Sequence, residues 1–163
     1  MFYECSALTT FSSVLPSLTE GYQMFFGCSN LNSFTSDLPS QTDGSAMFCN
    51  SGLKSFTSDL SSLTNCNEMF KYCENLESFT SDLSSLTNGG NMFRNCINLI
   101  APNVNLSSLT NGGAMFYGCY NFTAFSSDLS SLTDGDYMFY YCNKLTSFSS
   151  DMSNLQTGYH MFS

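Results

Sequence analysis

The chain has 163 residues, of which 42% are hydrophobic and only 10% are charged, with a net charge of −9. This composition belongs to a core-forming chain and excludes a disordered tail. Four Lys and Arg residues in all are too few for a basic patch, so we expect no nucleic-acid partner and no anionic membrane surface as a partner. No apolar run has the length of a membrane span.

The dipeptide Met-Phe occurs eight times, in steps of 22 or 23 residues. A fixed period in this range is typical of a solenoid, in which each repeat forms one coil stacked on the last. Solenoids carry polar caps, yet this chain opens and closes on repeat motifs, so we expect a fragment whose flanking repeats stack on it. We expect a single solenoid over residues 1–163, with repeats 1–23, 24–46, 47–68, 69–91, 92–114, 115–137, 138–160 and a partial repeat at 161–163.

The fourth repeat illustrates the elements in chain order. Residues 76–81 alternate apolar and polar positions, which predicts a short strand with Phe79 inward and Thr80 outward. Asp82 and the serines that follow can cap a short helical or 3₁₀ turn over residues 82–87. Asn88-Gly89 supplies residues tolerant of positive φ, which closes the coil. Strands joined in this way must lie parallel, one per coil.

Equivalent apolar side chains are expected to stack in the interior, each contributing roughly 1.5–3 kcal/mol through burial. Two phenylalanine columns and three leucine-rich columns run through the repeats. Two repeats depart from the pattern: the third is one residue short, and the fifth has Pro102 in place of the strand phenylalanine. Because proline lacks a ladder donor, we expect a bulge or broken strand pairing at Pro102.

The run from Met138 to Phe148, Met-Phe-x-x-Cys-x-x-Leu-Thr-Ser-Phe, resembles BspA-like leucine-rich repeats, with Gly135 as the upstream turn glycine. The run Met115-Phe-Tyr-Gly-Cys119 is similar to a group of bacterial surface-protein repeats. The resemblance implies a leucine-rich-repeat-like right-handed coil of seven 22–23-residue repeats, with one short parallel strand per repeat, turns or short 3₁₀ or helical segments, and a concave sheet. Ser81-Asp82 departs from the apolar residue and proline usual there, so strand length and curvature are expected to differ.

Six cysteines form a column, and Cys49 and Cys66 lie outside it. The 23-residue spacing follows the structural period, so it is a weak signal for disulfides. We expect the column cysteines to be small buried residues whose S–H groups point at backbone atoms. Zinc needs closely spaced ligands that this chain lacks, and we expect no cofactor and no metal from the cysteines.

An acidic column precedes the predicted turn, with Asn105 as its one amide: Asp37, Asp59, Asp82, Asp128 and Asp151. The main interpretation is local capping of the following turn, with the carboxylates in water. The alternative is a cation such as Ca²⁺ that bridges neighbouring carboxylates, although each coil offers only one.

Outward strand positions form two columns rich in hydroxyl groups, the second of which includes Asn103. Tyrosines gather beside Met-Phe, where exposed rings form adaptable contact surfaces or merely cover the edge of the coil. We therefore predict a binding surface on the strand face and the tyrosine edge, with these candidates: Ser33, Thr35, Ser55, Thr57, Ser78, Thr80, Tyr117, Tyr140 and Tyr141.

These features predict a non-enzymatic binding or adhesion module of a microbial or phage surface or secreted repeat protein. The single histidine, His160, has no partner column with which to build a catalytic triad. The predicted partner is a protein or glycan on a host or neighbouring cell. The location implied by the resemblance is extracellular or at the cell surface, with a virion-associated or cytoplasmic location left open. The alternatives are a structural spacer with no ligand and, remotely, an ice-binding Ser/Thr array.

Overall fold

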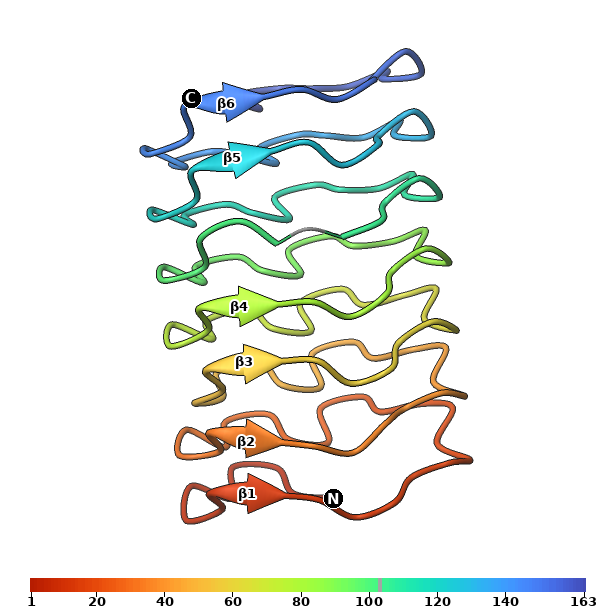
Figure 1. The fold of residues 1–163 in the computed structure, drawn as a ribbon, viewed down its shortest axis with the longest axis vertical. Coiled ribbons are helices and arrows are strands. Elements are labelled where there is room, and N and C mark those ends of the chain that lie inside the picture. The colour runs from red at the N-terminus through yellow and green to blue at the C-terminus, as the bar shows by residue number, and fades with distance from the viewer. Residues whose placement is uncertain (103) are drawn as a thin grey trace.

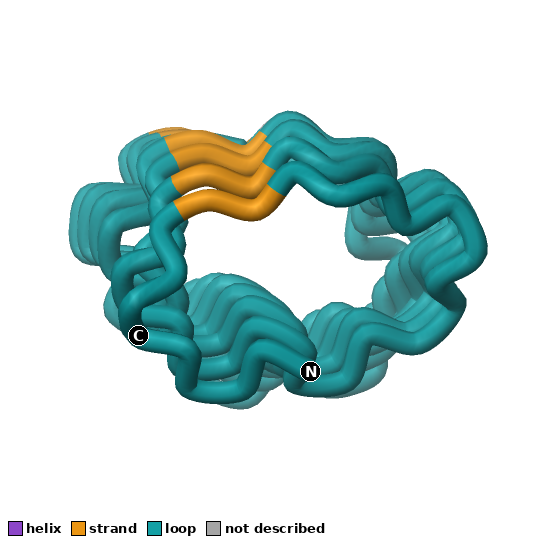
Figure 2. The backbone as a smooth tube through the Cα atoms, turned by 90° about the horizontal axis from the view of Figure 1, so that it is seen from below, coloured by secondary structure: helices purple, strands orange, loops and turns teal. Residues whose placement is uncertain are grey.

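The computed structural model describes residues 1–102 and 104–163, so the prediction for Asn103 lies outside the described residues. The coils are stacked one above another along the long axis (Figure 1). Seen along that axis, each coil is a flattened loop, and the strands lie together on one face (Figure 2).

The strands are shorter than expected, with two residues each. They are β1 (Thr10–Phe11), β2 (Ser33–Phe34), β3 (Ser55–Phe56), β4 (Ser78–Phe79), β5 (Ala124–Phe125) and β6 (Ser147–Phe148). They pair in parallel as β1–β2, β3–β4 and β5–β6, with equivalent residues in register. The prediction of a strand over residues 76–81 was too long, because the chain turns inward at buried Ser81 and Asp82 then closes a local turn.

Strand pairing fails at two places. The described part of the fifth repeat contains no strand, which confirms the break expected at Pro102, a residue with no N–H to donate. Pairing also stops between β2 and β3, where the third repeat is one residue short. Glycine is required at position 52 in this shortened repeat, because a Cβ there would overlap the carbonyl oxygen of Ser29 in the previous coil.

A second parallel ladder, which the sequence pattern did not predict, continues where strand pairing stops. Single-residue bridges connect the position before the turn glycine, or before Cys66 in the third repeat, with its equivalent in the next coil: Glu20, Asp43, Asn65, Asn88, Asn111, Asp134 and Thr157. Side chains reinforce it, as Asn65 Nδ2 donates to Asp43 Oδ2 and Asn88 Nδ2 donates to Asn65 Oδ1, both at 3.0 Å. The coils therefore stay connected through both strand breaks.

In the segment around Met-Phe, successive backbone N–H groups donate alternately to the next coil and to the residue three positions back in the same coil. In the fifth repeat, the N–H of Phe93 donates to the Met115 carbonyl of the next coil at 2.8 Å, whereas that of Met92 donates three residues back to Gly89 at 3.0 Å. The same alternation runs from Gly89 to Cys96, with the N–H of Gly90 satisfied by the Asn88 side chain. This segment is not a strand, yet it connects neighbouring coils as regularly as one.

The expectation of positive φ at the Asn-Gly turn was wrong. Positive φ falls just before Met and just before Cys, as at Asn91 (56°) and Asn95 (60°), because the alternating hydrogen bonds need left-handed residues there. Gly89 is required for space instead: a Cβ would lie 3.2 Å from Leu109 Cδ1 and from Met115 Cε. The methionine of the following coil occupies the room that the glycine leaves.

The expected helical or 3₁₀ segments are also absent. The described residues contain no helix, and so none long and apolar enough to cross a membrane. Residues 82–87 form only a single turn, closed by the Leu86 N–H donating to the Leu83 carbonyl at 3.0 Å. One turn fixes several dihedral angles for one hydrogen bond, and the chain leaves it before a helix can propagate.

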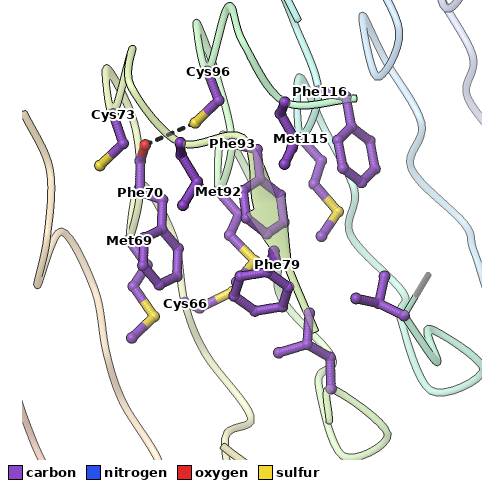
Figure 3. Close-up of a cluster of buried hydrophobic side chains, with 14 of the residues drawn as sticks. Cys66, Met69, Phe70, Cys73, Phe79, Met92, Phe93, Cys96, Met115 and Phe116 are labelled. Atoms are coloured by element: carbon purple, nitrogen blue, oxygen red, sulfur yellow. Dashed lines mark hydrogen bonds between the residues drawn. The ribbon is translucent and has the colours of Figure 1, made fainter. Parts of the chain in front are cut away.

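The core consists of stacked columns, as predicted. The rings of the Met-Phe phenylalanines stack nearly parallel with centroids 5.2–5.7 Å apart: Phe2, Phe25, Phe48, Phe70, Phe93, Phe116, Phe139 and Phe162. The strand phenylalanines meet them edge-on, as Phe79 meets Phe93 at 5.0 Å (Figure 3). Offset stacks and edge-to-face contacts are the favourable aromatic geometries.

Five of the six column cysteines, all but Cys5 in the first coil, are confirmed as buried residues whose S–H groups point at the backbone. Cys96 Sγ donates to the Phe70 carbonyl oxygen of the previous coil at 3.1 Å (Figure 3), and Cys28, Cys73, Cys119 and Cys142 repeat this contact. All eight cysteines are free, and only Cys5 is exposed. Burial raises the pKa of Cys73 to about 12, so the thiol remains a neutral donor.

Candidate functional site

The strand face carries six of the predicted binding candidates. Thr35, Ser55, Thr57, Ser78 and Thr80 are exposed, and Ser33 is half-buried. Register places Thr10 beside Ser33 and Ser55 beside Ser78, so hydroxyl groups form rows in these two strand pairs, whereas β5–β6 pairs Ala124 with Ser147. The breaks beside β3 and at Pro102 divide these rows, so the face is not one continuous lattice. A binding role for these six residues stays a prediction.

The aspartate column caps turns. Asp59, Asp82, Asp128 and Asp151 each accept a hydrogen bond at Oδ1 from the N–H two residues on, at 2.8–2.9 Å. Asp37 instead accepts from the N–H of Asp59 at 3.2 Å, because Pro39 has no N–H. The bonds from the Ser61 backbone and hydroxyl hold the pKa of Asp59 below its ordinary value.

These carboxylates do not converge. In residues 1–102 and 104–163, no group of three or more His, Cys, Asp or Glu side chains is arranged to hold a metal ion. Calcium requires six or more oxygen ligands, and one oxygen of each capping carboxylate is already engaged with backbone. The calcium alternative for this column therefore receives no support from its geometry.

An aromatic cluster lies at the edge of the later coils. Tyr117 stacks on Tyr140 with centroids 5.1 Å apart, and Tyr141 meets both rings edge-on at 5.8 and 4.2 Å. The Arg94 guanidinium lies over the Tyr117 ring, 4.4 Å from its centroid. We call Arg94, Tyr117, Tyr140 and Tyr141 the tyrosine edge; the structure brings its three predicted tyrosines together.

The tyrosine edge is partly open to solvent. Tyr141 is 43% exposed, and the other two tyrosines are half-buried. The hydrogen bond with Tyr141 raises the pKa of Tyr140, so its phenol stays neutral at physiological pH. The edge therefore offers ring faces, hydroxyl groups and one cation. Next to it, Tyr137 packs against Tyr140 at 5.6 Å and against His160 at 5.6 Å.

A shallow cleft of about 430 Å³ opens beside the broken strand position. It is lined by Glu77, Asn98, Ile100, Asn121, Thr123 and Lys144, which we call the polar cleft. A chain of hydrogen bonds orients its amides: Lys144 Nζ donates to Asn121 Oδ1 at 2.7 Å, and Asn121 Nδ2 donates to Asn98 Oδ1 at 3.3 Å. Ile100 is 54% exposed.

Sequence reasoning missed this cleft. Glu77, Ile100 and Thr123 share one variable outward position of the repeat, but Asn98, Asn121 and Lys144 come from a second position, two residues earlier. The available signal was a polar column between Cys and Leu. This polar column lines a cleft only where strand pairing is lost at Pro102, and the repeat period does not reveal that effect.

The family model for the BspA type leucine rich repeat region matches residues 1–77 and 66–163, in six copies. The seven repeats counted from Met-Phe spacing stay a prediction. No curated protein matches the chain in a search by sequence.

Among solved structures, the chain is similar to a leucine rich cell surface protein from Faecalibacterium prausnitzii, with 16% identity, a TM-score of 0.44 and 93% of this chain covered. It is also similar to a leucine-rich repeat protein from Bacteroides ovatus, with 16% identity, a TM-score of 0.31 and 91% covered. The chain spans 62% of the length of each of these two. With matches that extend from its first residue to its last, the chain belongs to the BspA type leucine-rich repeat family.

Proposed function

We propose that the chain is a non-enzymatic binding and adhesion module of a microbial or phage surface or secreted protein. It contacts a protein or glycan on a host or neighbouring cell through the strand face and the tyrosine edge. The observation that carries the proposal is the contiguous surface formed by Tyr117, Tyr140, Tyr141 and Arg94. Membership of the BspA type repeat family supports an extracellular or cell-surface location.

The tyrosine edge differs between repeats more than the core does, because the core columns have few exceptions, such as Pro102 and Gln41. The position after Met-Phe is tyrosine in three repeats (Tyr3, Tyr117 and Tyr140) but is Cys49, Lys71 and Arg94 in others. Packing therefore does not dictate which residue stands at this edge. Tyrosine and arginine are among the residue types enriched at the centres of binding interfaces, and a tyrosine ring supplies a large rigid contact area at little cost in conformational entropy.

A spacer with no ligand remains the competing function. It is favoured by the uninterrupted ladder from Glu20 to Thr157, which stiffens the stack along its length. A spacer needs no clustered aromatic surface. Removal of the tyrosine edge should therefore abolish binding if the chain is a binding module and should change nothing if it is a spacer.

The test compares binding before and after the edge is removed. The intact parent protein is applied to a glycan array and to host cells, together with a variant carrying Tyr117→Ser, Tyr140→Ser and Tyr141→Ser. Tyr22→Ser is the matched control, because Tyr22 is 68% exposed and belongs to an early coil away from the edge. We expect the triple variant to lose at least tenfold in affinity and the control to bind as the parent does. Equal binding by all three proteins refutes the tyrosine edge as the binding surface, whereas no binding by the parent on any surface supports the spacer and refutes the proposal.

A further inference from the structure

We propose that the polar cleft binds a neutral, 1,4-linked oligosaccharide of N-acetylated amino sugars. The proposal rests on the binding function proposed above, but it concerns a second surface whose residues are separate from the tyrosine edge. Its basis is the set of groups that converge where strand pairing is lost.

The cleft exists because the solenoid is interrupted there. Backbone hydrogen bonds join the outward position of one repeat to its equivalent in the neighbouring repeat. The Thr123 N–H donates to the Ile100 carbonyl at 2.9 Å, and the Glu77 N–H donates to the Lys54 carbonyl at 2.9 Å. Between Glu77 and Ile100, within the described residues, no such bond is formed. The missing strand next to Pro102 thus leaves room between two coils that elsewhere are joined, and Ile100 is left exposed at this point.

The amides of the cleft are oriented but not saturated. Asn98 Nδ2 donates to the Glu74 carbonyl at 2.9 Å, and Asn98 Oδ1 accepts from Asn121. A side-chain amide has two N–H donors and two oxygen lone pairs, so Asn98 retains one of each, and Asn121 does as well. An acetamido group is an amide with a methyl group, and it can pair with such an amide while its methyl covers Ile100.

The remaining groups suit sugar hydroxyls. Lys144 keeps two N–H donors after its bond to Asn121, and Thr123 contributes a hydroxyl group. The Glu77 carboxylate can accept hydrogen bonds from hydroxyl groups and repels acidic substituents, as does the net charge of −9, which favours a neutral ligand.

The spacing of the coils matches the ligand. The phenylalanine columns repeat every 5.2–5.7 Å, and an equatorially 1,4-linked pyranose advances by about one coil height per sugar. Successive sugars of such a chain are rotated by about half a turn, so equivalent groups on one face recur every second sugar and meet equivalent positions two coils apart, such as Asn98 and Lys144. An extended peptide repeats its side chains on one face every two residues, about 6.6–6.8 Å, and so falls out of step with the coils.

The experiment is isothermal titration calorimetry of the full chain with tetra-N-acetylchitotetraose. Cellotetraose, which lacks the acetamido group, and a capped tetra-alanine peptide, which has amides and methyls but no sugar, are the comparison ligands. We expect binding of the acetylated sugar at least tenfold tighter than that of either comparison ligand. No heat of binding with the acetylated sugar, equal binding of cellotetraose, or tighter binding of the peptide overturns the proposal.

Asn98→Ala is the decisive variant, and Asn30→Ala is its matched control. Asn30 has the same repeat position and the same kind of bond, from its Nδ2 to the Ser6 carbonyl at 2.8 Å, but it lies outside the cleft. We expect about a tenfold loss of affinity in Asn98→Ala and in the surface variant Ile100→Ser, and none in the control. Equal affinity in all three proteins refutes the assignment. The triple tyrosine variant retains sugar binding if the two surfaces act separately, so failure of one proposal can be told from failure of the other.

Discussion

Replacement of Phe79 by alanine tests the stacked core most directly. The Phe79 side chain is 1% exposed, and its ring lies 5.8 Å from Phe56, 5.5 Å from Phe70 and 5.0 Å from Phe93. The lost transfer free energy is about 1.5–3 kcal/mol, and the cavity with the lost ring contacts raises the total to about 3–5 kcal/mol. For a chain of this length, the melting temperature should fall by roughly 6–20 °C.

The matched control is Thr80→Ala, one residue further on. Thr80 is exposed, so its truncation should change the free energy of unfolding by less than about 0.5 kcal/mol. Urea unfolding followed by circular dichroism measures both variants. Phe148→Ala adds a gradation, because Phe148 occupies the same column but is only half-buried, and its loss should cost less than that of Phe79. Equal destabilisation by Phe79→Ala and Thr80→Ala would refute the division into inward and outward strand positions.

Four further predictions concern the shortened third repeat, a buried hydroxyl group and, in two cases, the thiols. Gly52→Ala should destabilise the fold by about 1–3 kcal/mol, because the new methyl overlaps the Ser29 carbonyl; an unchanged urea midpoint would contradict this. Ser81→Val should stabilise by about 1 kcal/mol, since the buried Ser81 hydroxyl has no hydrogen-bond partner and Val104 fills the same position in the next repeat; a lowered midpoint would argue for a partner. At pH 8 a thiol reagent should modify Cys5 alone before unfolding and all eight cysteines after it; rapid reaction of more than one would show that the coils open. Burial raises the folded-state pKa of the buried thiols, to about 12 for Cys73 and Cys142. Their contribution to stability is therefore complete below the unfolded pKa of about 8.5 and should decline from there to about pH 12; a thermal midpoint that stays constant over this range would contradict it.

Much of the fold could be predicted because a strict period makes every position a column. Burial of Phe79, exposure of Thr80, the parallel pairing and the break at Pro102 all follow from residue type repeated at a fixed spacing. The direction of the cysteine S–H groups follows in the same way. A cysteine that recurs in every coil is stacked on other cysteines, so its weak S–H donor has only backbone oxygens within reach.

Predictions failed where the backbone conformation depends on the next coil. Gly89 was assigned a positive φ from turn chemistry, but its role is to leave space for Met115, which lies 26 residues later. The helical turn failed for a related reason: hydrogen bonds to neighbouring coils compete with local ones, and residues 82–87 retain only a single turn.

The sequence by itself determined the period, the identity of the core columns and the position of the strand break, because these depend only on which residue types recur and at what distance. Tertiary structure alone decided which outward residues share a surface. Asn98, Asn121 and Lys144 are 23 residues apart and become neighbours only when their coils stack, and the room beside Ile100 opens only because the adjoining coils lose their strand pairing. A repeat unit specifies its own inside and outside, whereas a cleft between units is a property of how they meet.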